Sequence, residues 1–258
     1  MKTVIIPTLN EEENIGRLIP AIYDYLGEKG VTVVVVDDAS EDRTCEVAEK
    51  LGEEYSIKLL ERRGQRGISS AVRWASEKAG NGHVAVMDAD WSHHPMYLPM
   101  LFKKIELGYD IVVGSRYVSG GGVDGWPSYR HFLSLGATVL AKALFRFPIR
   151  DPMSGYAAFK SSQLLIDGIA DSESKFLIDV LASNNHLRIV EIPIVFRNRK
   201  LGSSKLTGVT LIGYLNQILS QYLQRKKRRA WMNRPSSLAI PVEPVHFASL
   251  HQTDITNQ

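Results

Sequence analysis

Short apolar runs alternate with amphipathic stretches through the first half of the chain. Continuous valine and isoleucine runs predict strands that are covered on both faces, and apolar residues at helical spacing predict the helices between them. The predicted strands are 3–6, 31–36, 57–60, 84–87 and 111–113, and the predicted helices are 12–26, 42–52, 68–79 and 96–107. This alternation predicts an α/β fold with a mainly parallel sheet and helices on both of its faces.

The pattern changes after Ser119. Residues 119–129 are rich in glycine and have no period, which is typical of a functional or a disordered loop. Further on, helices are predicted at 131–146, 163–169, 176–183 and 206–223, and strands at 156–159 and 189–196. Five consecutive cations fill 225–229, and the tail after Trp231 has no period. We therefore expect three units: a folded domain at 1–205, an amphipathic, basic helix at 206–229 and a disordered tail at 230–258.

Composition narrows the class of protein. The 258 residues are 44% hydrophobic and 23% charged, as in ordinary soluble domains. The single cysteine, Cys45, excludes a disulfide framework and a cysteine-rich zinc site. A net charge of +3 gives no reason to expect a nucleic-acid partner. No run approaches the ~20 apolar residues of a membrane-spanning helix, and a strand at the very start leaves no room for a signal peptide, so we expect a cytoplasmic protein.

Paired aspartates follow two of the predicted strands. Asp88 and Asp90 end one strand, and Asp37-Asp38 end another. Like charges this close repel each other, and a hard cation such as Mg²⁺ or Mn²⁺ would relieve the repulsion while also binding substrate phosphates. One Asp-x-Asp could be a solvated turn, but a second acidic pair at the end of another apolar run favours a site for a metal-bound diphosphate. Zinc is not favoured, because the adjacent His93 and His94 point apart and carboxylates prefer a hard ion.

Several motifs carry a family resemblance when they are taken together in order. They lie at residues 6–11, 37–38, 87–95, 114–117, 151–156, 191–193 and 202–206, with Arg199 between the last two. They resemble those of the family 2 glycosyltransferases with the GT-A (Rossmann-like) fold, and within them the dolichyl-phosphate mannose synthases and related polyprenyl-phosphate glycosyltransferases. The resemblance covers about residues 2–222.

The resemblance implies a role for individual residues. Asp88 and Asp90 are the implied metal ligands, with Asp90 the expected direct ligand, and Ala89 shares their diphosphate position. The residues implied to hold the nucleotide base and ribose are Pro7, Leu9, Glu11, Val36 and Asp38. The cations implied to bind phosphates are Arg116, Arg199 and Lys205, although a lone cation is ordinarily a surface charge.

Asp151 has two interpretations. It could be a turn or helix-cap residue, whereas the resemblance places it beside the acceptor or the donor sugar. With Asp90 and Arg116 it completes the implied catalytic set. A phosphate acceptor has its second pKa near ~6 and is largely ionised at neutral pH, so a general base is unnecessary.

The expected reaction follows from the resemblance. A hexose, expected to be mannose from GDP-mannose, would pass to dolichyl or polyprenyl phosphate with inversion, giving a β-linked lipid-phosphate sugar. Open alternatives are UDP-glucose or UDP-N-acetylglucosamine as donor, a soluble acceptor, or a non-catalytic nucleotide-sugar-binding membrane tether. Helical segments at 131–149 and 206–223, with cations beside them, predict peripheral binding to the cytoplasmic face of a membrane, although both could pack on the sheet as ordinary core. The sequence does not predict an oligomeric state.

Overall fold

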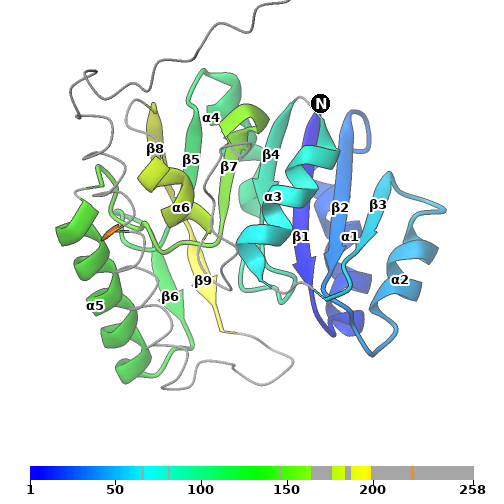
Figure 1. Ribbon diagram of the computed structural model, residues 1–258, viewed down its shortest axis with the longest axis horizontal. Helices are drawn as coiled ribbons and strands as arrows, with labels where there is room; N and C mark the ends of the chain where they lie inside the picture. The colour runs from blue at the N-terminus through cyan, green and yellow to red at the C-terminus, as the bar shows by residue number, and fades with distance from the viewer. Residues whose placement is uncertain are drawn as a thin grey trace, which may run out of the picture.

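The computed structural model describes residues 1–64, 67–80, 82–145, 147–163, 176–183, 187–198 and 222–223. Strands and helices alternate through most of this part of the chain (Figure 1). The strands are β1 (Lys2–Thr8), β2 (Val31–Asp37), β3 (Ile57–Glu61), β4 (His83–Val86), β5 (Ile111–Ser115), β6 (Gly122–Asp124), β7 (Ala157–Lys160), β8 (Ile189–Pro193) and β9 (Val195–Arg197). The helices are α1 (Glu12–Leu26), α2 (Thr44–Leu51), α3 (Ile68–Ala79), α4 (Leu98–Glu106), α5 (Ser128–Phe145) and α6 (Phe176–Ser183), with 3₁₀ turns η1 (Pro95–Tyr97) and η2 (Ser161–Gln163).

Seven strands form one sheet in the order β3-β2-β1-β4-β7-β5-β8. The pairs are parallel except where β7 lies antiparallel between β4 and β5. The prediction of a mainly parallel α/β sheet is therefore confirmed, and the antiparallel insertion of β7 is the feature that it did not contain. The carboxyl ends of β1, β2 and β4 meet at one edge of the sheet, where ligands of such sheets bind.

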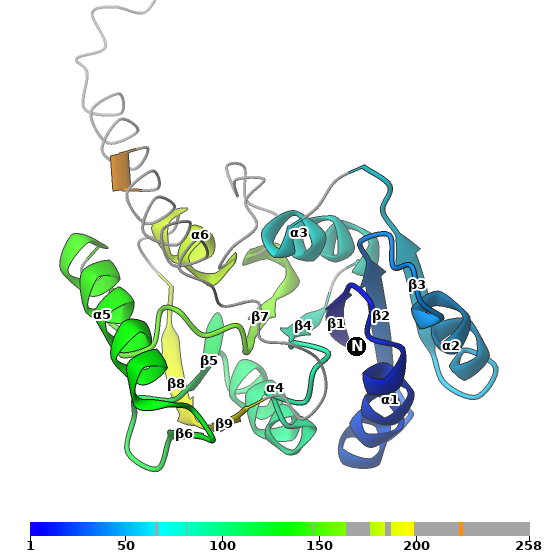
Figure 2. The same ribbon diagram turned by 90° about the horizontal axis from the view of Figure 1, so that it is seen from below.

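Helices cover both faces of the sheet, as the continuous valine runs predict. Figure 2 shows α1, α2 and α4 on one face of the sheet and α3 and α6 on the other. The inner side chains of α5 belong to the same core as those of α3 and α6. The four valines at 33–36 in β2 point alternately into these two cores, and each is at most 1% exposed.

The prediction of a single strand at 189–196 is wrong. The chain leaves the large sheet after Pro193, which has no N–H to continue a ladder, and β9 pairs with β6 in a separate two-stranded sheet. Strand β6 lies in the segment predicted to be irregular. The predicted helix at 163–169 falls largely outside the described residues, which show the turn η2 at its start.

Helix α5 has two different faces. Its inner face packs through Ala137, Ala141 and Phe145. Leu144 is partly buried against the same core. Six other large apolar side chains of α5 are between 37% and 70% exposed: Tyr129, Phe132, Leu133, Leu135, Val139 and Leu140. Tyr222 packs edge-on against Phe145, with ring centroids 6.0 Å apart. Within the described part of the chain, no helix has the length and apolar character needed to span a bilayer.

Strained backbone marks the carboxyl edge of the sheet. Asn10, Ala39 and Trp91 have φ values of 58°, 62° and 62°, in the left-handed region that residues other than glycine rarely adopt. They follow β1, β2 and β4 respectively. Strain of this kind gathers at functional sites, so this edge is where a site is expected.

Candidate active site

The turn after β4 carries Asp88 and Asp90. The Asp90 residue is 5% exposed, and its Oδ1 accepts a hydrogen bond from the Ser92 N–H at 3.1 Å. The Asp88 side chain is 31% exposed. The two predicted metal ligands therefore lie in the same turn, one facing solvent more than the other.

His93 supports this turn from inside the protein. It is 1% exposed, and its Nδ1 accepts a hydrogen bond from the Asp88 N–H at 3.0 Å. Its ring stacks on Tyr156 at 4.8 Å and meets Phe196 edge-on at 5.3 Å. An Nδ1 that accepts this hydrogen bond is not available to a metal, so His93 positions Asp88.

Gly155 leaves the space that this arrangement needs. A Cβ built on Gly155 would lie 3.1 Å from His93 Cε1 and 3.6 Å from Asp88 Oδ1. The neighbouring Tyr156 is fully buried, and its hydroxyl donates to the His94 carbonyl at 3.0 Å. Burial raises the pKa of Tyr156 well above its ordinary value, so this hydroxyl keeps its proton.

The residues in the turn suit a hard divalent cation. Asp88 and Asp90 offer carboxylate oxygens, and the described residues contain no cluster of three or more His, Cys, Asp or Glu that could hold a metal. The buried Ser92 hydroxyl beside them has no hydrogen-bond partner among the described residues. Mg²⁺ typically takes one or two carboxylates and completes its shell with water and substrate phosphates. The donor set therefore fits Mg²⁺ or Mn²⁺ better than zinc.

The two aspartates of the second pair have different roles. Asp37 is 1% exposed and accepts hydrogen bonds from the Ser40 N–H at 2.7 Å, the Ser40 hydroxyl at 2.5 Å and the Thr8 hydroxyl at 3.0 Å. It closes the turn after β2. Asp38, one of the five residues predicted to hold the base and ribose, has a side chain that is 13% exposed.

Asp38 is paired with Arg62, which the sequence analysis did not single out. Arg62 Nε donates to Asp38 Oδ1 at 2.7 Å, and Nη2 donates to Oδ2 at 2.7 Å. The Gly67 N–H also donates to Oδ2, at 3.2 Å. Arg62 follows the end of β3, and a position just beyond an apolar strand is the signal that could have drawn attention to it.

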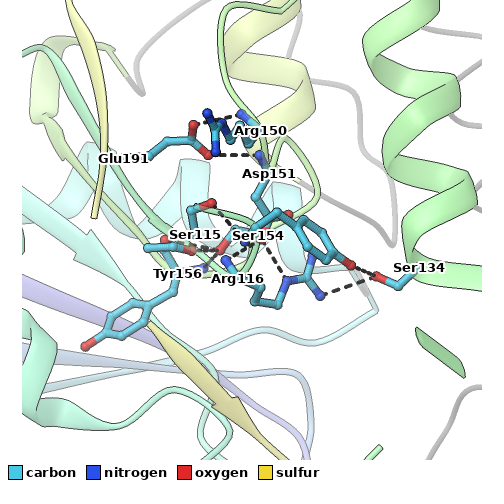
Figure 3. A network of polar contacts seen from close by, with 10 residues as sticks. Ser115, Arg116, Ser134, Arg150, Asp151, Ser154, Tyr156 and Glu191 are labelled. Atoms are coloured by element: carbon cyan, nitrogen blue, oxygen red, sulfur yellow. Dashed lines mark hydrogen bonds and ion pairs between the residues drawn. The ribbon is translucent and has the colours of Figure 1, made fainter. Parts of the chain in front are cut away.

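Arg116 and Asp151 form a buried ion pair (Figure 3). Arg116 Nε and Nη2 each donate to one Asp151 oxygen at 2.7 Å, and the Arg116 N–H donates to Asp151 Oδ2 at 3.0 Å. Burial alone would lower the pKa of Arg116, but the charge and hydrogen bonds of Asp151 raise it above its ordinary value. Two of the three predicted catalytic residues thus belong to one unit, in which Asp151 fixes the guanidinium of Arg116.

Glu191 holds the loop that carries Asp151. Its two carboxylate oxygens accept hydrogen bonds from the backbone N–H groups of Arg150 and Asp151, at 2.7 and 2.9 Å (Figure 3). On the opposite side, Arg116 Nη1 donates to the Ser134 hydroxyl of α5 at 3.4 Å. Through Glu191 and Ser134, the ion pair therefore connects the end of β5 with β8 and with α5.

The other predicted site residues are distributed as follows. Pro7, Leu9 and Glu11 are partly exposed at the end of β1. Val36 and Ala89 are 0% and 3% exposed, so both are buried at the carboxyl edge of the sheet. Arg199 and Lys205 lie outside the described residues, as does most of 206–229 and all of 230–258.

Comparison with protein families identifies one matching model, described as "Glycosyl transferase family 2", over residues 3–164. The chain is 40% identical to the "Dolichol-phosphate mannosyltransferase" of Pyrococcus furiosus over 84% of its own length and 62% of the relative. It is 35% identical to the "Polyprenol monophosphomannose synthase" of Mycolicibacterium smegmatis, over 80% of each chain. It is also 35% identical to the "Undecaprenyl-phosphate mannosyltransferase" of Micrococcus luteus, over 79% of its length and 86% of the relative.

Solved structures share the fold. A glucosyl-3-phosphoglycerate synthase from Mycobacterium tuberculosis, crystallised with Mn²⁺, UDP-glucose and phosphoglyceric acid, superposes with a TM-score of 0.65 at 18% identity, over 87% of this chain and 79% of that one. The same enzyme has been crystallised with Mg²⁺ and UDP, with a TM-score of 0.63. This likeness confirms the GT-A type of fold.

Proposed function

The chain is a member of glycosyltransferase family 2, and from this membership we propose that it transfers a mannosyl group from GDP-mannose to a polyprenyl or dolichyl phosphate. One observation carries the proposal: the Asp88–Asp90 turn stands at the carboxyl edge of the sheet in a chain 35–40% identical to three proteins named as lipid-phosphate mannosyl-transferring enzymes. All three relatives are named for mannose, which favours mannose over the glucose and N-acetylglucosamine alternatives.

The order of the strands supports one orientation of the donor. Asp38 follows β2, β1 comes next in the sheet, and the Asp88–Asp90 turn follows β4. Neighbouring strands are ~4.8 Å apart, so these carboxylates are separated by about two strand spacings. A nucleoside diphosphate laid across β1 would place its base at Asp38 and its diphosphate at Asp88 and Asp90.

Asp88 and Asp90 would hold Mg²⁺ or Mn²⁺ in this arrangement. When bound, the cation supplies positive charge to the leaving diphosphate. His93 and Gly155 contribute by fixing where the Asp88 backbone and carboxylate lie.

The reaction needs no general base. An oxygen of the acceptor phosphate attacks the anomeric carbon of mannose as the bond from that carbon to the diphosphate breaks, and the configuration inverts. The acceptor oxygen is already ionised near neutral pH. Asp151 is fully buried and bound to Arg116, so it supplies orientation rather than proton transfer. Arg116 keeps its positive charge beside α5, on the side from which a lipid phosphate would approach.

The apolar face of α5 supports a membrane-bound acceptor. We propose that this face lies in the membrane interface and that the protein is peripheral on the cytoplasmic side. Apolar side chains on a helix can enter the boundary between headgroups and acyl chains. The basic run at 225–229 would add attraction to anionic lipid.

A panel of labelled nucleotide sugars tests the proposal. The protein is incubated with each donor, a short polyprenyl phosphate and Mn²⁺, and label in the organic phase is counted. The proposal predicts transfer from GDP-mannose. Transfer from UDP-glucose or UDP-N-acetylglucosamine alone would show that this nucleotide sugar, and not GDP-mannose, is the donor. Binding of nucleotide sugar without transfer to any acceptor would favour the non-catalytic tether, and transfer only to a water-soluble acceptor would exclude the lipid.

A further inference from the structure

The loops that follow β1 and β2 are bound to each other by hydrogen bonds in both directions. The Asn10 N–H donates to the Ser40 hydroxyl at 2.8 Å, and the Glu41 N–H donates to Asn10 Oδ1 at 2.8 Å. Asn10 is exposed, so these bonds, rather than burial, hold it in place. Asn10 therefore connects the loop at residues 9–11 with the loop at residues 38–41.

The two bonds join turns that both contain backbone in the left-handed region. Asn10 has a φ of 58°, and Ala39, directly before Ser40, has a φ of 62°. Such conformations persist where the surrounding structure determines them. Ser40 is itself fixed, because its N–H and its hydroxyl donate to the buried Asp37 at 2.7 and 2.5 Å. The side chain that receives the Asn10 N–H is thus already held by the turn after β2.

The same two loops are also joined at the start of α1. The Glu11 N–H donates to the Thr44 hydroxyl at 2.9 Å. The Glu12 N–H donates to Asp42 Oδ2 at 3.2 Å. These bonds connect the loops where α1 and α2 begin, whereas Asn10 connects them closer to the ends of the strands.

The place of the Asn10 contact matters for the donor proposed above. Strand β1 lies between β2 and β4 in the sheet. A nucleoside diphosphate that reaches from Asp38 to the Asp88–Asp90 turn therefore crosses the end of β1, where residues 9–11 lie. Ordering loops on binding costs free energy, and a surface that is ordered beforehand avoids this cost.

We propose that Asn10 is a positioning residue for the donor, which holds the loops after β1 and β2 together so that the surface for the nucleoside diphosphate is formed in the free protein. This inference rests on the proposed function, because it takes the donor to lie across the end of β1. It adds that donor affinity depends on a contact between two loops, made by a residue that does not itself have to touch the nucleotide.

Calorimetric titration of Asn10→Gly with GDP and Mn²⁺ tests the inference. Glycine adopts a φ of 58° freely and keeps the backbone N–H, so the variant removes the Oδ1 acceptor without adding strain. We expect GDP to bind about 10-fold more weakly, because the loops must then be ordered on binding. The KM for GDP-mannose should rise with it, whereas the KM for the polyprenyl phosphate should not change.

Ala39→Gly is the matched control. It places glycine at a similar φ in the other loop and removes no hydrogen bond, because alanine has no polar side-chain atom. It should keep the wild-type affinity for GDP. Equal weakening by Ala39→Gly and Asn10→Gly would assign the effect to glycine and overturn the inference.

Amide hydrogen exchange at Glu41 separates positioning from direct contact with the ligand. In the free wild type, this N–H should exchange slowly and change little when GDP and Mn²⁺ are added. In Asn10→Gly it should exchange faster in the free protein and regain protection when GDP and Mn²⁺ bind. Weaker binding without faster exchange in the free variant would indicate a direct contact and overturn the inference.

The remaining outcomes distinguish this inference from the proposed function. Unchanged GDP affinity in Asn10→Gly would overturn the inference and leave the proposed transfer standing. If Asn10→Gly does not fold, Ser40→Ala, which removes the acceptor of the Asn10 N–H, replaces it: weaker GDP binding supports the inference, and unchanged binding overturns it. A wild type that binds GDP but transfers no mannose would remove the proposed function alone. A wild type that binds no nucleoside diphosphate would remove both.

Discussion

At the scale of single residues, the site depends on a position that has no side chain. Gly155 shows this directly, because its absent side chain makes room for His93 and Asp88. His93 cannot easily move away, since it is stacked on Tyr156 and bound to the Asp88 backbone.

Gly155→Ala is therefore expected to displace Asp88 and to lower the turnover number about 10-fold or more, since small misplacements of reacting groups are costly. Steady-state transfer assays measure this. Gly16→Ala is the matched control: a Cβ there would make an ordinary contact of 3.6 Å with Val47, and alanine favours helix α1. Equal activity of Gly155→Ala and the wild type would show that the site tolerates the shift.

Ala39 tests whether the strain at this edge can be removed. Its φ of 62° disfavours a residue with a Cβ, and glycine adopts this region freely. Ala39→Gly is expected to raise the free energy of unfolding by about 0.5–1 kcal/mol, after allowing for the extra entropy of glycine in the unfolded chain. Denaturant titration gives the value, and a loss of stability would mean that the methyl group of Ala39 makes a contact that outweighs the strain.

The chemistry of individual residues was partly predictable. Acidic pairs after apolar strands indicated the two positions at the sheet edge, and the structure places Asp88, Asp90 and Asp38 there. The pairings of Asp38 with Arg62 and of Asp151 with Arg116 join residues 24 and 35 positions apart. No periodicity of the chain encodes such a contact, so it emerges only when the strands are ordered in space.

At the scale of elements, helix α5 bears the most distinctive surface. Burying one exposed phenylalanine or valine in lipid is worth ~1.5–3 kcal/mol. Phe132 and Val139 are 70% and 58% exposed. The double variant Phe132→Ser/Val139→Ser should sediment with anionic liposomes at least about 10-fold less than the wild type.

Leu107→Ser is the control for this experiment, because Leu107 is 65% exposed but follows α4 rather than lying on α5. Sedimentation of the double variant to the same extent as the wild type, or no binding of either at low and moderate salt, would contradict the proposed membrane face.

Element types followed from periodicity, whereas the ends of elements depended on tertiary pairing. The predicted strand at 189–196 is divided because its first part, β8, pairs with β5 in the large sheet, whereas the following residues form β9 and pair with β6. Three residues of β6 inside a glycine-rich stretch carry no local signal, because their pairing partner lies more than 70 residues away.

At the scale of the whole molecule, an ionic cluster remote from the site connects β5, β7 and β8 at the opposite edge of the sheet. Asp110 accepts hydrogen bonds from Lys160 Nζ at 2.5 Å and from the Arg188 N–H at 2.9 Å, which ties the start of β5 to β7 and to the residue before β8. Burial of Asp110 would raise its pKa, but the hydrogen bonds and charges of Lys160 and Arg188 lower it below its ordinary value.

Asp110→Asn should therefore lower the free energy of unfolding at neutral pH by about 1–2 kcal/mol. Because the folded-state pKa is depressed, this contribution is complete above the unfolded-state pKa near ~4 and is lost as the pH falls through the folded-state value. Unfolding measured from pH 7 to pH 3 should show wild type and variant converging in acid. A constant difference across that range would contradict the assignment.

The overall architecture was predictable because strand, helix and burial patterns agree over the first half of the chain. The position of β7 between β4 and β5 was not, since a four-residue strand shows no preference for a neighbour. This insertion places Gly155 and Tyr156 directly behind the Asp88 turn, so the part of the topology that the sequence left open is also the part that completes the site.

The most direct test of the central claim is transfer of labelled mannose from GDP-mannose to a polyprenyl phosphate, with Mn²⁺, by the wild type and by Asp90→Asn. The account predicts that the wild type moves label into the organic phase, and that the variant, with an unchanged circular dichroism spectrum, loses at least about 100-fold in rate, because one of the charges facing the leaving diphosphate has been removed. Transfer by the folded variant at close to the wild-type rate would contradict it.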